Sequence, residues 1–223
     1  MSNRNILCIS DLHIPFEHKN ALDFCLDVKK KYKCEKVFFM GDIVDLHSCS
    51  FHEQSTEGMS AGEEVNIAKN KIKPWAKAFP NADICIGNHD ARPFRKASAA
   101  GISSQFIKNY NQVWDTPSTW RWNWSFDYQG LLFKHGNRDG IYSHINIAKD
   151  EMRATVTAHT HASGGVHFMA SHEKLIWGLN CGCLININEY AFHYAKDCTR
   201  RPIVGCGVVL DNSTIPVFVP MKL

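Results

Sequence analysis

The sequence lacks any apolar run that approaches the roughly 18 residues needed to cross a membrane. It begins with MSNRN and runs directly into a strand-like segment, without the apolar core of a secretory signal. No linker, repeat or low-complexity segment interrupts its 223 residues, and we expect one domain over residues 1–223. These absences predict a cytoplasmic protein without a membrane partner.

A disulfide framework and a strong charge of either sign are also missing. The nine cysteines include no CxxC pair and no regular spacing, so we expect reduced thiols, as is usual in the cytoplasm. The formal net charge of +3 is too small to indicate polyanion binding by itself. Hydrophobic residues make up 44% of the chain and charged residues 21%, which is ordinary for a globular protein with a sizeable core.

The sequence does contain side chains that commonly bind metals, each placed directly after an apolar, strand-like run. There are five such places: Asp11 with His13, Asp42 with Asp45, Gly87 to Asp90, His135 with Gly136, and His159 with His161. In an open α/β sheet, sites form at the carboxyl ends of the strands. These five groups can therefore converge on one crevice although they are scattered along the chain.

The alternation of strand-like and helix-like segments predicts an α/β fold. A strand at 5–10, a helix at 20–31 and a strand at 36–40 form a βαβ unit, which is typical of a parallel sheet. A longer helical period covers 62–79, where Pro74 could kink or split the helix. After the last motif the apolar runs are short, and we expect antiparallel strands that finish a second sheet. The expected architecture is a mixed two-sheet β-sandwich flanked by helices.

Residues 120–126 alternate aromatic and polar side chains with the period of a β-strand. We expect one strand with three tryptophans and Phe126 on one face. That face could stack on a nucleobase, or it could belong to the core or to a subunit interface. We favour the second interpretation, which would allow a homodimer.

The order Asp-x-His, Gly-Asp-x-x-Asp, Gly-Asn-His-Asp, His-Gly and His-x-His resembles the five-block signature of the calcineurin-like metallophosphoesterase superfamily, from about residue 6 to residue 161. The resemblance implies the four-layer fold of that superfamily and a hydrolase that acts on phosphoric esters. The compact chain is similar to stand-alone bacterial or phage-encoded members. This implies action in the cytoplasm of a bacterium, or of the host if a phage encodes the protein.

The resemblance also implies a binuclear metal centre. One ion would be held by Asp11, His13, Asp42 and His161, and the second by Asp42, Asn88, His135 and His159. Asp42 would bridge the ions, because a carboxylate can offer one oxygen to each. Oxygen and imidazole ligands without thiolate suit Mn²⁺, our first expectation, and also Fe, Zn²⁺ or Ni²⁺. The sequence alone does not choose among these metals.

The residues around Asn88 are candidates for the chemistry itself. His89 could donate a proton to the departing oxygen or stabilise an equatorial phosphate oxygen, while a hydroxide that bridges the ions attacks phosphorus in line. Asp90 could fix the tautomer of His89 or cap the next helix. We expect Asp45 to orient its loop or a ligand histidine rather than to bind metal.

Four residues are candidates for substrate binding. Arg92 and Arg95 follow the central motif and could contact phosphate, because guanidinium forks match phosphate oxygens, although a structural salt bridge is an equal alternative. Asn88 would face the substrate as well as a metal. His47, in the polar loop 47–52, could line the pocket or simply belong to a loop.

The substrate class follows partly from what is missing. Phosphoprotein phosphatases of this superfamily carry Arg-Gly after the second Asp, where this chain has Leu46 and His47. We therefore expect a phosphodiesterase for a nucleotide, a cyclic nucleotide or a nucleic-acid end, with a broad-specificity phosphomonoesterase as the alternative. A scaffold that has lost catalysis is disfavoured, since every expected ligand and His89 are present. No DNA-binding cap is visible, so we do not expect duplex processing.

Overall fold

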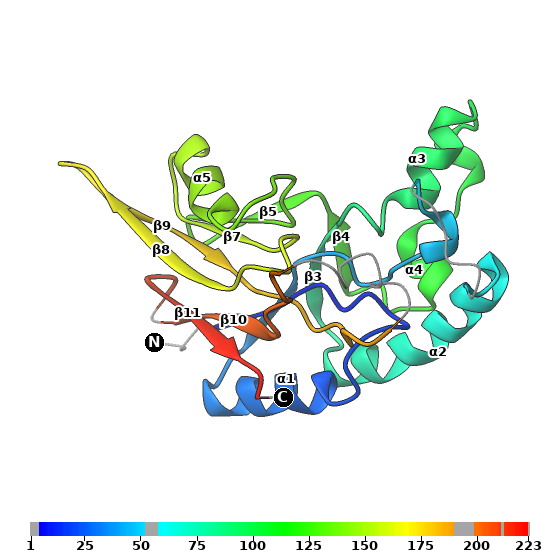
Figure 1. Cartoon of the computed structure of the whole chain (residues 1–223), viewed down its shortest axis with the longest axis horizontal. Coiled ribbons are helices and arrows are strands. Elements are labelled where there is room, and N and C mark those ends of the chain that lie inside the picture. Colours follow the sequence, from blue (N-terminus) through cyan, green and yellow to red (C-terminus); the bar gives the residue numbers. More distant parts are fainter. Residues whose placement is uncertain (1–4, 52–57, 190–198, 211, 223) are drawn as a thin grey trace.

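The computed structural model describes residues 5–51, 58–189, 199–210 and 212–222. Two β-sheets pack against each other, and helices lie along their outer sides (Figure 1). Within the described part of the chain, no helix combines the length and the apolar character that a membrane crossing requires. The fold is thus α/β, as predicted.

The first sheet has six strands in the order β11-β10-β1-β2-β3-β4. Its strands are β1 (Ile6–Ile9), β2 (Lys36–Phe39), β3 (Ala82–Cys85), β4 (Trp120–Asn123), β10 (Gly205–Leu210) and β11 (Ile215–Pro220). β1 to β4 run parallel to one another. β10 pairs antiparallel with β1, and β11 pairs antiparallel with β10. The helices α1 (Ala21–Lys31) and α2 (Ala61–Ala78) provide the crossovers that parallel neighbours need.

The second sheet has five strands in the order β5-β6-β7-β9-β8. Its strands are β5 (Ser125–Tyr128), β6 (Leu131–Lys134), β7 (Thr155–Thr157), β8 (Gly165–Ala170) and β9 (Leu175–Asn180). β6, β7 and β9 are parallel, while β5 and β8 pair antiparallel at the edges. Both sheets are mixed, which confirms the predicted two-sheet sandwich. α5 (Ser143–Asp150) covers the outer side of this sheet (Figure 1).

Shorter helical elements surround one end of the sandwich. They are the 3₁₀ turns η1 (His47–Cys49) and η2 (Ser104–Phe106) and the helices α3 (Arg92–Ala99) and α4 (Tyr110–Trp114). η1 and α3 directly follow two of the polar motifs, so they determine where the neighbouring side chains point.

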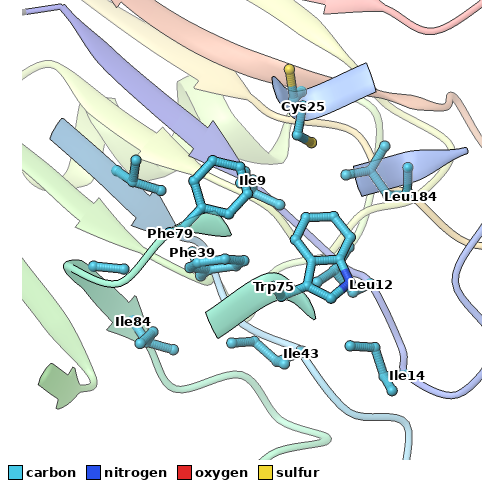
Figure 2. Packing of buried hydrophobic residues seen from close by; sticks show 14 of the residues in the cluster. Ile9, Leu12, Ile14, Cys25, Phe39, Ile43, Trp75, Phe79, Ile84 and Leu184 are labelled. Carbon is cyan, nitrogen blue, oxygen red and sulfur yellow. The ribbon is translucent and has the colours of Figure 1, made fainter. Parts of the chain in front are cut away.

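One core lies between the first sheet and its helices (Figure 2). The rings of Trp75 in α2 and of Phe79, the C-cap residue of that helix, pack on Phe39 of β2, with centroids 6.1 and 6.0 Å away. α2 continues through Pro74, so the proline does not split the helix. The burial of neighbouring apolar side chains such as Ile72 on the sheet offsets the cost of an interior proline, which is about 3 kcal/mol.

A second core joins the two sheets. Phe38 of β2 stacks on Phe133 of β6, with ring centroids 4.0 Å apart and planes 7° apart. Both side chains are fully buried. Since β2 and β6 each lead into a polar motif, this contact sets the distance between the strand ends that form the site.

The prediction of one strand over residues 120–126 is wrong. The chain leaves the first sheet after β4 and enters the second sheet with β5. Trp120 is buried and Trp122 packs on the core between the first sheet and its helices, as the core interpretation requires. Trp124, where the chain passes between the sheets, is 61% exposed, and Phe126 packs in the core between the two sheets. The alternating pattern is present, but it does not reveal that the backbone passes from one sheet to the other.

The prediction for the C-terminal strands is partly wrong. β8 and β9 do finish the second sheet, but β10 and β11 extend the first sheet, where β10 pairs with β1. Apolar runs of this length indicate strands without indicating a partner, and either sheet could have accepted them.

Candidate metal centre

The predicted site residues lie at one end of the sandwich, where parallel strands of both sheets end. β1, β2 and β3 of the first sheet and β6 and β7 of the second each lead into one motif. In chain order these strands deliver Asp11 and His13, Asp42 and Asp45, Asn88 and His89, His135, and His159 and His161. The structure therefore brings all seven predicted metal ligands to one place.

Asp11, His13 and His161 form the first cluster, with ligand atoms within 4.8 Å of one another. His161 Nε2 lies 3.1 Å from Asp11 Oδ1 and 3.1 Å from His13 Nε2. Asp11 and His13 are buried, while His161 is partly exposed. A carboxylate oxygen and two imidazole nitrogens thus face a common point.

Asp42, His135 and His159 form the second cluster. His135 Nε2 is 3.2 Å from Asp42 Oδ2 and 3.3 Å from His159 Nδ1. Asn88 joins them, because its Oδ1 lies 3.0 Å from His135 Nε2. These four residues are the ones predicted to hold the second ion.

The carboxylate of Asp42 lies between the two clusters. Its Oδ2 is 3.2 Å from His135 Nε2 and 3.7 Å from His13 Nε2. One side chain therefore faces ligands of both predicted ions, which is the arrangement that a bridging carboxylate requires.

His13 and His135 are held so that their Nε2 atoms face the centre. His13 Nδ1 lies 2.7 Å from Asp45 Oδ1, and His135 Nδ1 lies 2.9 Å from the carbonyl oxygen of Met40. Each acceptor fixes the proton on Nδ1 and leaves Nε2 for a metal, as outer partners of metal-binding histidines usually do. Asp45 orients a predicted ligand, as expected, and the donor set fits divalent cations.

The buried charges shift the pKa values of these histidines upward. Burial lowers the pKa of His13, but nearby carboxylates, Asp11 and Asp45 first, outweigh it and raise the pKa to about 10. Burial also lowers the pKa of His135, and the charge of Asp42 raises it to about 9. In the metal-free protein these imidazoles hold protons at neutral pH, and a metal ion must displace them.

Four of the predicted ligands have left-handed backbone conformations. The φ angles are 47° for Asp11, 49° for His13, 49° for Asp42 and 72° for His159. Such residues cost about 1–3 kcal/mol each and gather at functional sites. Asp11 and His13 thus converge across a turn with left-handed residues at both ends.

Two glycines allow the motifs to approach closely. A Cβ on Gly87 would lie 2.1 Å from Asp42 Oδ1 and 2.3 Å from the Asp42 backbone nitrogen. Gly41 has a φ of 100°, and a Cβ there would lie 2.7 Å from His135 Nδ1. The glycines before Asp42 and Asn88 are thus needed for contact between the loops, and Gly41 is needed for its left-handed turn as well.

His89 is held by two neighbours. Its Nδ1 lies 2.8 Å from the Asp45 carbonyl oxygen, and its Nε2 lies 3.1 Å from Nη2 of Arg92. A guanidinium only donates, so Nε2 accepts and Nδ1 carries the proton. Burial lowers the pKa of His89, in agreement with a neutral ring.

The predictions for Asp90 are corrected. Its carboxylate accepts hydrogen bonds from the backbone N–H of Gly87, at 2.9 Å, and of Val44, at 3.3 Å, and not from His89. It does not cap α3 either, since Ala91 is the N-cap residue. Burial raises the pKa of Asp90 to about 7. Asp90 ties two loops together beneath the site, and Asp45 takes the place beside His89.

The predicted substrate-binding residues occupy different surroundings. Phe51, Asn88, Arg92 and Arg95 line a pocket of about 270 Å³ beside the second cluster. Arg92 also has a structural role, because its Nη1 donates a hydrogen bond to the Asp45 carbonyl oxygen at 2.7 Å. A contact with phosphate and a structural role are thus both compatible with the position of Arg92.

His47 is absent from this pocket lining in the described part of the chain. Its Nδ1 instead lies 3.9 Å from Asp45 Oδ2. The cause is Glu64 of α2, a buried residue that the sequence reading missed, whose carboxylate accepts from the backbone N–H of His47 at 2.7 Å and of Ser48 at 2.9 Å. Residue 52, the last of the predicted polar loop, lies outside the described residues.

The chain is similar to proteins of a known family. Residues 4–183 match the family model of the calcineurin-like phosphoesterases. This match spans most of the chain, and together with the groups of His and Asp side chains it indicates a binuclear site for divalent metal ions.

Individual relatives are more distant. The gene 54 protein of Mycobacterium phage D29 is 24% identical over 245 residues, covering 98% of this chain and 94% of that protein. The structure of vacuolar protein sorting 29 from Cryptosporidium parvum has a TM-score of 0.47 at 15% identity and covers 99% of both chains. A phosphoesterase from E. coli has a TM-score of 0.43 at 12% identity, covering 98% of this chain and 100% of that one.

Replacing Gly87 by alanine should strongly weaken metal binding. The new methyl group would meet the backbone of Asp42, which cannot move without displacing the bridging carboxylate. We expect Mn²⁺ affinity to fall by at least about 100-fold, which is the upper end of the effect of outer-shell changes, as measured by calorimetry. Gly62→Ala is the matched control, because a Cβ at Gly62 meets nothing within 4 Å. Wild-type affinity in Gly87→Ala would refute the close-approach explanation.

Mn²⁺ binding should release about two protons at pH 7, one each from His13 and His135, because both pKa values lie above neutrality. Affinity should therefore rise with pH from 7 towards 9. Titration calorimetry in buffers of different ionisation enthalpy counts the protons. His135→Asn should release about one fewer, and an affinity that does not change with pH would contradict the assignment.

Proposed function

The chain belongs to the calcineurin-like phosphoesterase family, and from this membership we propose that it is a phosphodiesterase that uses two divalent metal ions, Mn²⁺ foremost. The proposed substrates are small phosphodiesters of the nucleotide, cyclic nucleotide or nucleic-acid-end type. The observation that carries the proposal is the position of Asp42 between the two His/Asp clusters.

The residues divide the work of hydrolysis. When bound, two divalent ions supply an activated water and neutralise charge on the phosphate. Asp11, Asp42 and Asn88 offer oxygen ligands, and the four histidines of the clusters offer nitrogen. Asp45 keeps His13 oriented, and we assign to His89 the transfer of a proton to the departing oxygen.

His89 needs a change of partner before it can act as an acid. Its Nε2 accepts a hydrogen bond from Arg92, so this nitrogen carries no proton in the free enzyme. A phosphate oxygen that accepts the Arg92 hydrogen bond would free Nε2 to take up a proton from solvent water, which His89 would then pass to the departing oxygen. The resulting imidazolium would be stabilised by Asp45, whose Oδ1 lies 3.2 Å from His89 Nδ1.

We favour a diester over a monoester because the guanidinium of Arg92 is already engaged in hydrogen bonds. A monoester dianion carries more charge than a diester, and Arg92 already donates to the carbonyl oxygens of Asp45 and Leu46. The proposed place of action is the cytoplasm of a bacterium or phage host, which the similarity to a mycobacteriophage protein supports.

Two chromogenic substrates test the proposed specificity. After chelation and reloading with Mn²⁺, we expect kcat/KM for bis(p-nitrophenyl) phosphate to exceed that for p-nitrophenyl phosphate at least tenfold, a difference of about 1.4 kcal/mol in transition-state binding. The reverse order would favour the phosphomonoesterase alternative. If the Mn²⁺-loaded chain hydrolyses neither substrate, the proposal is refuted.

His89→Ala should keep both metals and lose turnover by roughly 10²–10⁴-fold on substrates with a poor leaving group, because general acid catalysis contributes about that much. The loss should be much smaller for p-nitrophenyl esters, whose leaving group needs little protonation. Metal analysis and a rate series over leaving groups are the measurements. Full activity of His89→Ala on a methyl ester would show that another group protonates the leaving oxygen.

A further inference from the structure

The pocket beside the second cluster has an aromatic wall that hydrolysis of a phosphoester does not require. Asn88 lines this pocket and also lies 3.0 Å from His135 Nε2, so the pocket opens from the place where the scissile phosphate is proposed to bind. Its volume of about 270 Å³ is near the lower end of about 300 Å³ for ligand pockets. That space suits one small ring system and not a folded protein segment.

Phe51 forms the aromatic wall, and its side chain is 53% exposed. The segment just before it is held in place from within the protein. The carboxylate of Glu64 is buried and accepts from two backbone N–H groups, those of His47 and Ser48. A buried carboxylate therefore anchors the backbone three residues before the ring, which supports its use as a binding platform.

Two cations lie beside this ring. Arg95 and Lys96 are three and four residues after Arg92 on α3, so all three share one helix face. The Arg95 guanidinium carbon is 5.1 Å from the Phe51 ring centroid, and Lys96 Nζ is 5.4 Å from it. In the parts of the chain that the structure describes, neither cation pairs with a carboxylate.

We propose that this pocket is a subsite for the nucleoside portion of the substrate, an inference that rests on the proposed phosphodiesterase function. The base stacks on Phe51, because a planar base can occupy a position like that of the planar guanidinium. Arg95 and Lys96 face the anionic oxygens next to the base. A nucleotide offers an aromatic ring and an anion together, whereas a simple alkyl diester offers only the anion.

Two diesters with the same leaving group test the subsite. They are thymidine 5′-(p-nitrophenyl phosphate) and methyl p-nitrophenyl phosphate, assayed with the Mn²⁺-loaded full chain. Phe51→Ala should raise KM for the thymidine ester at least about fivefold, the lower limit for loss of base stacking. The methyl ester should change less than about twofold, since it has no base to stack. Phe51→Trp should keep the preference for the thymidine ester.

Phe168→Ala is the matched control, because Phe168 is 57% exposed on β8, the edge strand of the second sheet. This substitution should leave KM for both esters unchanged. Arg95→Ala should raise KM for both esters with little change in kcat, since it removes binding shared by ground and transition states. Arg153→Ala, before the amino end of β7, should change neither value.

The outcomes separate the two proposals. If the wild-type chain hydrolyses neither ester with Mn²⁺ bound, the phosphodiesterase proposal fails and the subsite fails with it. If it hydrolyses both, and Phe51→Ala changes both equally or neither, the subsite is refuted while the phosphodiesterase proposal stands.

Discussion

The contacts of the buried Asp42 carboxylate are the constraint on which the rest of the centre depends. Oδ1 accepts from the backbone N–H of His89 at 2.8 Å, while Oδ2 faces the imidazoles of His135 and His13. An unpaired carboxylate in this position would carry a large desolvation cost. The loop after β3, the end of β6 and the turn after β1 must therefore all stay within reach of one side chain.

This constraint explains the unusual backbone around the site. Three chain segments can surround one carboxylate only if they lack bulk where they meet, which is the role of Gly87. Left-handed turns at Asp11 and Asp42 direct the side chains inward at the strand ends. The large cores on both sides of the first sheet offset the strain.

The sequence predicted the parts of this structure that depend on local pattern. Strand ends, the helix through 61–78 and the meeting of the predicted ligands all follow from periodicity and from the type of residue after each strand. The sequence did not predict features that depend on which segments meet in space. Glu64 looks like an acidic residue that favours the first turn of its helix, yet it also binds the backbone at His47 and Ser48. The passage of the chain from the first sheet to the second at Trp124 could not be predicted for the same reason.

Each cluster takes residues from both sheets. Asp11 and His13 come from the first sheet and His161 from the second, while Asp42 faces His135 and His159 in the same way. A bound ion would therefore link the two sheets at this end, and the sheets could not separate there without losing metal ligands.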